Sequence, residues 1–493
     1  MRETLLRRYS RGKIIDLWPY PNPRPPYGSP NFPRLEPSSY DAEPELNDEF
    51  RIIVQVEDHI AVAADRGSQI VLARVVHLGK RRHPDMRCEG MPLPSRPKPD
   101  YPVHTDDLIA LNFFDHAFFK GSPSMSPAQR ADSCFARQAY PLRYLYEAGG
   151  KRSPPGHKGD FEKLTGGRCI VPEFYGTWAT FVDDGAGQRR FVSVVATEYI
   201  QGKSIADMCD ELSYVSDNYL IPRPRAFFPR FRSDEAATLR LHEGTRLAIL
   251  QDVIRQLANH IHLGVKYNNM PLSASDIVVT MYDKNGQLLD KPRAVLFKLT
   301  NYEVWETTQD HLDSLEKFGI DSPNHGRDTL EITSRPIHPY EMFCAYSVVE
   351  LAGWFPSLWM ENPYMFDAWL LKVFGAFEYG DHRNSSGKYS TFAELDSIED
   401  PAMGEYAVQE EKERKERFSK AIACFKKWTA TQAWPPFIKP ADIVAIPLRC
   451  REKVEERRVP AWKFPAAASA SVALQPAVAL AVRPTTMLED RIR

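Results

Sequence analysis

The stretch that decides the fold covers residues 246–305 and reads RLAILQDVIRQLANHIHLGVKYNNMPLSASDIVVTMYDKNGQLLDKPRAVLFKLTNYEVW. Its first part is apolar at the spacing of one helix face, carried by Leu247, Leu250, Ile254, Leu257 and Ile261. An irregular loop follows over residues 264–276. Two apolar runs then flank Asn285 and Gly286, a pair that tolerates the positive φ of a hairpin turn. The stretch therefore predicts a buried helix, a loop and a β-hairpin, in that order.

Length and composition narrow the class of protein. The 493 residues are enough for two lobes, each with its own core. The formal net charge of −2 gives no reason to expect nucleic acid or an anionic membrane as a partner. Seven scattered cysteines without a C-x-x-C pair favour reduced thiols over disulfides or a zinc site. Since there is no secretion signal and no apolar run of roughly 18 residues, we expect an intracellular protein, cytoplasmic with the nucleus as an alternative.

Upstream of the deciding stretch, the sequence predicts a small β-rich region with one helix inserted in it. The predicted strands cover residues 51–56, 68–76, 107–115, 169–178 and 191–200, and the predicted helix covers residues 133–145. The turn between the first two strands holds Gly67, and the third strand holds Asn112. A β-rich unit therefore precedes the apolar helix.

This order of elements resembles the protein-kinase fold, as found in fungal kinase-like and aminoglycoside-phosphotransferase-like proteins. In that fold a glycine-rich loop covers the nucleotide phosphates, a strand carries a lysine, a helix carries its glutamate partner, and a catalytic loop follows a buried helix. The resemblance covers residues 50–305. It implies an α+β, bilobal, protein-kinase-like fold with a small β-rich N-lobe and a larger, mainly helical C-lobe.

The resemblance also implies a nucleotide cleft. Its candidate lining residues are Gly67 in the glycine loop and Glu198, Tyr199 and Ile200 in the hinge between the lobes. The phosphate-binding lysine falls at Asn112 and its glutamate partner at Ala136. One glycine exposes few backbone N–H groups to phosphate, and an amide brings no positive charge. An ordinary hairpin turn at Gly67, and a strand leading into a helix N-cap at Ser204, are the alternatives that need no ligand.

The catalytic loop fits the kinase pattern in two registers. One places Asn269 at the catalytic base and the other places Pro271 there, so neither supplies the aspartate. Asp276 falls at the position that binds the second metal ion, and it is the one oxygen ligand that remains. Lys298 stands where the main magnesium ligand is expected, and a cation there opposes metal binding.

The flanking regions complete the predicted organisation. The predicted parts are a disordered Pro-rich arm over 1–48, an N-lobe over 49–200 with an insertion at 78–105, a C-lobe over 201–430, and a C-terminal segment over 431–493 that is largely disordered after 450. Aromatic residues between 338 and 375 predict lobe core, with an exposed aromatic groove as the alternative. A charged helix over 405–428 is expected to bury Phe418, Ile422 and Phe425 and to leave residues 409–417 solvated.

The departures from the kinase pattern predict a catalytically impaired kinase-like protein, a pseudokinase, that acts as an interaction or regulatory module with a protein partner. No cofactor is predicted for such a module. The alternative is an atypical ATP-dependent phosphotransferase for a protein or a small molecule, which would bind ATP and Mg²⁺ and would give Asp276 and Lys298 new roles. The sequence does not indicate an oligomeric state.

Overall fold

The computed structural model holds one compact unit over Met1–Val454 and a second over Glu455–Arg493. The residues that it describes are 6–20, 25–28, 31–33, 46, 48–63, 66–79, 103–151, 171–183, 189–210, 219–231, 233, 235–262, 264–267, 271–283, 286–297, 302–304, 307–309, 338–356, 358–375, 404–431 and 443–447. All of them belong to the first unit, which mixes helices and strands.

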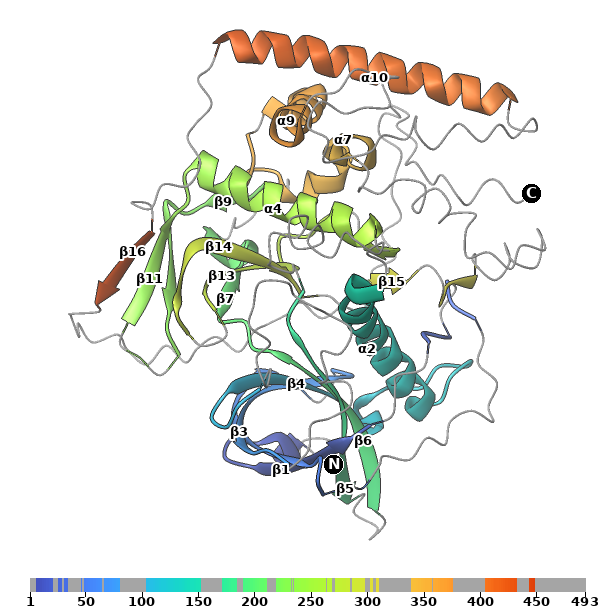
Figure 1. The fold of residues 1–493 in the computed structure, drawn as a ribbon, viewed down its shortest axis with the longest axis vertical. Coiled ribbons are helices and arrows are strands. Elements are labelled where there is room, and N and C mark those ends of the chain that lie inside the picture. The colour runs from blue at the N-terminus through green and yellow to red at the C-terminus, as the bar shows by residue number, and fades with distance from the viewer. Residues whose placement is uncertain are drawn as a thin grey trace. The chain divides into compact units, whose positions relative to one another are not determined.

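Six antiparallel strands close into a barrel in the first part of the chain (Figure 1). They are β1 (Ile14–Pro19), β2 (Ile52–Ala61), β3 (Gln69–His77), β4 (Leu108–Phe114), β5 (Phe174–Asp183) and β6 (Arg189–Glu198). Their order around the barrel is β1-β2-β3-β4-β6-β5. Side chains alternate between the two faces of a strand, and Leu17, Val54 and Leu111 are almost fully buried in one apolar cluster. The apolar cluster of the barrel is therefore made by side chains of its strands, together with Tyr9, Val103 and Phe118 from outside them.

The first strand of the barrel departs from the sequence prediction. β1 pairs with β2, where Ile15 lies opposite Val54, and also with β5, so it closes the ring. The disordered arm predicted over residues 1–48 is therefore wrong at this strand. Burial alternates along Ile14–Pro19 with the period of two that a strand requires. The sequence did not predict this strand because its six residues lie beside a proline-rich segment, and the composition of that segment favoured disorder over a strand.

One long helix, α2 (Pro127–Lys151), is inserted between β4 and β5 in sequence and packs against both of them and against β6. Phe135, Ala139 and Leu142 belong to its buried face. The structure confirms a helix over residues 133–145 and extends it at both ends. Pro141 lies inside α2 without ending it, because packing of the apolar face offsets the lost hydrogen bond.

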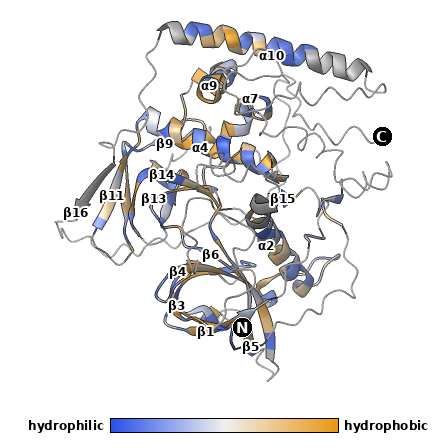
Figure 2. Ribbon diagram, in the orientation of Figure 1, coloured by the Kyte–Doolittle hydropathy of each residue, from blue (hydrophilic) through white to orange (hydrophobic). Residues whose placement is uncertain are grey.

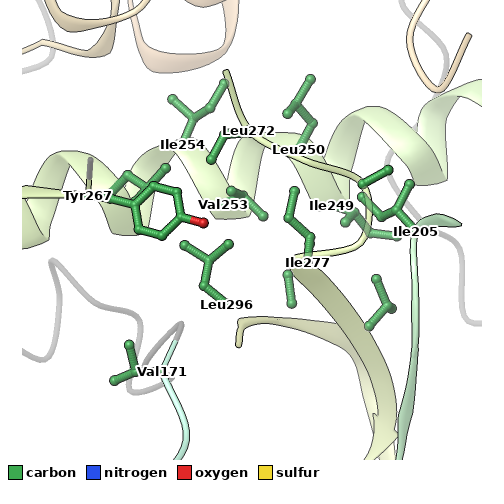
Figure 3. Close-up of a cluster of buried hydrophobic side chains, with 14 of the residues drawn as sticks. Val171, Ile205, Ile249, Leu250, Val253, Ile254, Tyr267, Leu272, Ile277 and Leu296 are labelled. Atoms are coloured by element: carbon green, nitrogen blue, oxygen red, sulfur yellow. The ribbon is translucent and has the colours of Figure 1, made fainter. Parts of the chain in front are cut away.

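The deciding stretch folds as predicted. The helix α4 (Glu243–His262) buries Leu247, Leu250, Ile254 and Leu257 and half-buries Ile261. Figure 3 shows Leu250 and Ile254 of this helix gathered with Leu272 and Ile277 in one apolar cluster. After the loop, β13 (Ile277–Tyr282) pairs with β14 (Leu288–Leu296) as an antiparallel hairpin. Gly286 in the turn has a φ of 71°, the conformation for which glycine is suited.

Two short strands frame the loop. β12 (Val265–Tyr267) lies before it and pairs with β15 (Tyr302–Val304), which follows the hairpin. A third short strand, β7 (Gly202–Ser204), follows the last barrel strand in the chain and pairs with β13. The linker after the barrel, the hairpin and the central helix thus form one packed body.

Further short and long elements complete the described part of the chain. They are η1 (Arg7–Tyr9), η4 (His116–Phe118), η5 (Ala206–Met208), β8 (Cys209–Asp210), β9 (Ile221–Pro222), β10 (Arg225–Pro229), β11 (Glu235–Arg240), α7 (Pro339–Met342), η8 (Ala345–Leu351), α8 (Leu358–Glu361), α9 (Tyr364–Phe374), α10 (Gly404–Thr431) and β16 (Ile443–Pro447). The aromatic residues Trp354, Phe355, Trp359, Phe366, Trp369 and Phe374 are buried. Figure 2 shows α9 largely in the hydrophobic colour. The predicted aromatic core is confirmed, and the alternative of an exposed aromatic groove is wrong.

The charged helix α10 carries one residue that the sequence placed in solvent. Arg417 forms a bidentate ion pair with Asp367 of α9, through Nε at 2.9 Å and Nη2 at 2.6 Å, and also donates to the backbone oxygen of Phe343 at 2.8 Å. The solvated face predicted over residues 409–417 is therefore wrong at its last position. No described helix is long and apolar enough to span a membrane.

Candidate functional site

The barrel strand β4 meets helix α2 through a pair of neutral amides. Asn112 of β4 donates from Nδ2 to Oε1 of Gln138 at 2.5 Å, and Asn112 is 7% exposed. Its Oδ1 is buried and has no hydrogen-bond partner among the described residues. No charge stands at this contact, where the resemblance implies a lysine and a glutamate.

Asn112 contacts Gln138 and not Ala136, the residue that the resemblance sets at the position of the glutamate. Ala136 is 1% exposed and belongs to the apolar core, whereas Gln138 makes the contact. Two residues along a helix correspond to a rotation of about 200°, so these two side chains leave opposite faces of α2. A shift of the alignment by two positions would have found Gln138.

The turn between β2 and β3 is fixed by protein groups. The side chain of Gln69, which is fully buried, accepts from the Ala63 N–H and donates to the Ala63 and Arg66 backbone oxygens at 2.6–3.0 Å. At Gly67 an added Cβ would lie 2.9 Å from the ring of Phe119, which is itself buried. Glycine is required there because an aromatic ring packs against it. This geometry explains Gly67 without a phosphate.

The predicted hinge residue Glu198 is held in a buried ion pair. Its Oε1 lies 2.7 Å from Nη1 of Arg293 on β14, and its Oε2 accepts the N–H of Glu173 at 3.1 Å. Arg293 also donates to the backbone oxygen of Val171 at 3.2 Å. The side chains are 3% and 12% exposed. Glu198 therefore ties the end of β6 to the hairpin.

Tyr199 and Ile200, the other two predicted hinge residues, also pack against other parts of the chain. Burial, with a smaller contribution from Asp58, raises the pKa of the Tyr199 hydroxyl to about 12, and the Tyr199 ring meets Phe231 edge-on at 6.3 Å between centroids. Ile200 belongs to a small apolar cluster, separate from the two larger cores, that also contains Val278, Val295 and Phe297. This cluster lies where the linker passes the hairpin.

Asp276, the predicted metal ligand, closes the loop before β13. It is 1% exposed. The Tyr267 hydroxyl donates to its Oδ2 and the Ser275 hydroxyl to its Oδ1, both at 3.2 Å, and its backbone oxygen accepts the Phe297 N–H at 3.0 Å. Among the described residues no group of three or more His, Cys, Asp or Glu could hold a metal ion. Asp276 thus joins the loop to β12.

The structure describes one of the three remaining candidate positions. Pro271 is half-buried at the end of the described loop. Asn269 and Lys298 lie outside the described residues. In the β4–β6 ladder Asn112 lies opposite Val195, three residues before Glu198. The amide pair therefore lies beside β6, three residues along that strand from the ion pair that joins Glu198 to the hairpin.

Comparison with known proteins gives little further information. No protein-family model matches the chain, and no curated protein matches it. Among solved structures, the chain is similar to one described as the crystal structure of Toxoplasma gondii specific rhoptry antigen kinase domain. That match has 12% identity and covers 77% of this chain and 86% of the other, with a TM-score of 0.28. A likeness of this size carries no argument about function.

Proposed function

We propose that this chain has a bilobal, kinase-like fold whose phosphoryl-transfer site has been replaced by neutral or internally paired groups, and that it acts as an interaction or regulatory module for a protein partner. The observation that carries the proposal is the amide pair of Asn112 and Gln138. In kinases the corresponding lysine and glutamate form an ion pair that active enzymes require.

The arrangement of elements supports the kinase-like part of the proposal. A helix enters between β4 and β5 and faces the strand with Asn112. A buried helix precedes a loop, and a hairpin follows that loop. β12 and β15 pair across the ends of the loop-and-hairpin unit. These are the relations expected from the order of elements in the sequence.

The chemistry of the individual groups supports loss of transfer. Phosphoryl transfer depends on cations at the phosphates, on metal ligands and on an aspartate that positions the acceptor. Asn112 and Gln138 are uncharged. The Ala63 N–H in the phosphate-loop position is bonded to Gln69, and both carboxylate oxygens of Asp276 accept hydrogen bonds from hydroxyl groups. Each of these four groups is neutral or already hydrogen-bonded within the described part of the chain.

A second candidate is the atypical ATP-dependent phosphotransferase. The observation that favours it is the position of Asp276, whose carboxylate directly precedes β13, beside the apolar cluster of Ile200, Val278 and Val295. A carboxylate released from Tyr267 and Ser275 is a hard oxygen ligand of the kind that Mg²⁺ takes.

A thermal-shift series on the full chain with ATP, with and without Mg²⁺, separates the two candidates. A ligand at a hundred times its Kd stabilises a protein by about 2.7 kcal/mol. The proposal predicts no Mg²⁺-dependent shift in the wild-type chain. A shift that needs Mg²⁺, disappears in Asp276→Ala and persists in the control Ser10→Ala contradicts the proposal and favours the enzyme.

A further inference from the structure

The strand β10 lies at the edge of a three-stranded sheet, with β11 as its neighbour and β16 on the other side of β11 (Figure 1). Its side chains alternate between two faces, as in any strand. Ala226 and Phe228 are buried in the main apolar core. Arg225 and Phe227 are exposed on the opposite face, and 53% of Phe227 is accessible to solvent. The strand therefore presents a cation and an aromatic ring side by side.

Two arginines on this exposed face lie opposite each other without an acidic residue between them. Arg225 of β10 is the direct partner of Arg240 of β11, and both are exposed. Neither guanidinium has an ion pair or a hydrogen bond with another described residue. Like charges directly opposite in an antiparallel pair destabilise it, so this position of the hairpin favours an anion.

The neighbouring arginines differ in this respect. Arg223, just before β10, pairs with Asp210 at 2.9 Å. Arg230, just after β10, pairs with Glu235 at 3.0 Å. The arginines at both ends of the strand thus have acidic partners within the chain, and the pair between them has none among the described residues.

The backbone of β10 is also open at these positions. The Arg230 N–H donates to the Glu235 oxygen at 2.9 Å, and hydrogen-bonded pairs alternate with non-hydrogen-bonded pairs along an antiparallel ladder. Counting back along the register, Arg225 and Phe227 belong to non-hydrogen-bonded pairs. Their N–H and C=O groups therefore point away from β11, toward the open edge.

The open stretch is short. Pro224 and Pro229 flank it and carry no N–H, and the Pro229 oxygen accepts a hydrogen bond from the Gln201 side chain. Prolines on an edge strand limit uncontrolled pairing with other chains. A strand that adds here gains few backbone hydrogen bonds, so its side chains have to supply much of the affinity and the specificity.

We propose that β10 is a docking edge for an extended acidic peptide of a partner protein. A carboxylate of the peptide contacts Arg225 and Arg240, and an apolar side chain of the peptide packs on Phe227. Because side chains two residues apart share one face of a strand, the peptide carries an Asp or Glu and an apolar residue separated by one position. Carboxylates form short, charge-assisted hydrogen bonds with guanidinium groups, and one placed at this pair removes the repulsion between the two cations.

A peptide fits this face better than single-stranded nucleic acid does. Nucleic acid stacks successive bases on several rings along a basic channel, whereas the exposed face of β10 and β11 carries one aromatic ring, Phe227. Open backbone groups on an edge strand are suited to another polypeptide. The inference rests on the proposed function for the claim that the chain works through a protein partner.

Selection of peptides on the full chain tests the proposal without assuming a sequence. Random heptapeptides displayed on phage are expected to converge on an Asp or Glu two positions from an apolar residue. For a selected peptide labelled with fluorescein, the double variant Arg225→Ala/Arg240→Ala is expected to raise the Kd about tenfold or more in fluorescence anisotropy. The matched control, Arg223→Ala/Arg230→Ala, makes the same change in net charge at arginines that have acidic partners, and it is expected to keep the Kd within about twofold.

Hydrogen exchange of the full chain with and without the selected peptide tests the edge itself. Exchange at the Arg225 and Phe227 N–H groups is expected to slow on binding, while the Arg230 N–H, which is already bonded to Glu235, keeps its rate. The variant Arg225→Ala/Arg240→Ala is expected to keep the melting temperature of the wild-type chain, because it removes two exposed side chains that repel each other. Its loss of binding is thereby distinguished from unfolding.

Three results overturn the inference. In the first, selection yields no peptide with the acidic and apolar pair. In the second, both double variants weaken binding equally, which shows general attraction to positive charge. In the third, labelled oligothymidylate binds and the selected peptide does not displace it, which assigns the face to nucleic acid. Mg²⁺-dependent phosphoryl transfer by the chain would refute the proposed function and would leave the peptide measurements unchanged, so the two failures are distinguishable.

Discussion

The buried ion pair between Glu198 and Arg293 gives a prediction that separates a structural hinge from a ligand-binding one. The perturbation is Arg293→Ala. It removes the 2.7 Å contact to Glu198 and the bond to the Val171 oxygen. Glu198, which is 3% exposed, then keeps the Glu173 N–H as its contact in place of a cation. Breaking a buried pair by removing one partner costs about 3–5 kcal/mol.

Urea denaturation followed by circular dichroism measures this cost as a change in the free energy of unfolding. The control is Arg223→Ala, because Arg223 and Asp210 form a pair at 2.9 Å with side chains 47% and 60% exposed, and exposed pairs contribute at most about 1 kcal/mol. Replacing both Glu198 and Arg293 by leucine is expected to recover most of the loss, because no charge is left buried. The reasoning is refuted if Arg293→Ala costs no more than the control.

Three further predictions concern stability. Burial lowers the pKa of His260 to about 3 and that of His338 to about 4, whereas the imidazole of the unfolded chain takes up its proton near 6.5. The contribution of these neutral histidines to the free energy of unfolding is therefore fully present above about pH 6.5 and is expected to fall by about 2 kcal/mol per histidine at pH 5. Equal free energies of unfolding in urea at pH 7 and pH 5 would contradict this. Arg417→Ala leaves Asp367 buried without its guanidinium and is expected to cost about 3–5 kcal/mol. Lys420→Ala removes an ion pair with Glu416 that is exposed to solvent and is expected to cost much less, so equal losses in the same urea assay would contradict the assignment. Gly67→Ala pushes a methyl group against the Phe119 ring and is expected to cost about 1–3 kcal/mol, with partial recovery in the double variant with Phe119→Leu; an unchanged melting temperature in Gly67→Ala would show that the ring does not pack there.

The sequence predicted the elements whose burial repeats with a clear period. Leu247, Leu250, Ile254 and Leu257 mark one face of α4, and Gly286 marks the turn of the hairpin, so both elements were found. β1 was missed because its six residues lie beside a proline-rich segment. β1 is stabilised by hydrogen bonds to the edges of β2 and β5. Because those edges form only when the chain folds, the local sequence does not indicate the strand.

The candidate site was predicted less well than the fold, because its contacts join distant parts of the chain. Asn112 was identified, but the sequence pointed to Ala136 on the helix, whereas Gln138 makes the contact. Two positions along a helix place the side chains on opposite faces, so this small error selects a side chain on the wrong face. Glu198 was expected to face a ligand, yet its partner Arg293 is 95 residues away. Nothing local in the sequence indicates that ion pair.

The proposed function requires that the described groups at the kinase-like positions, Asn112, Gln138 and Asp276, do not bind and activate ATP. The most direct measurement is the rate of γ-phosphate release or transfer from ATP with Mg²⁺ by the full chain, compared with Asp276→Ala and with the control Ser10→Ala. The account predicts that all three chains give the same background rate. A Mg²⁺-dependent rate in the wild-type chain and in Ser10→Ala that Asp276→Ala abolishes would contradict it.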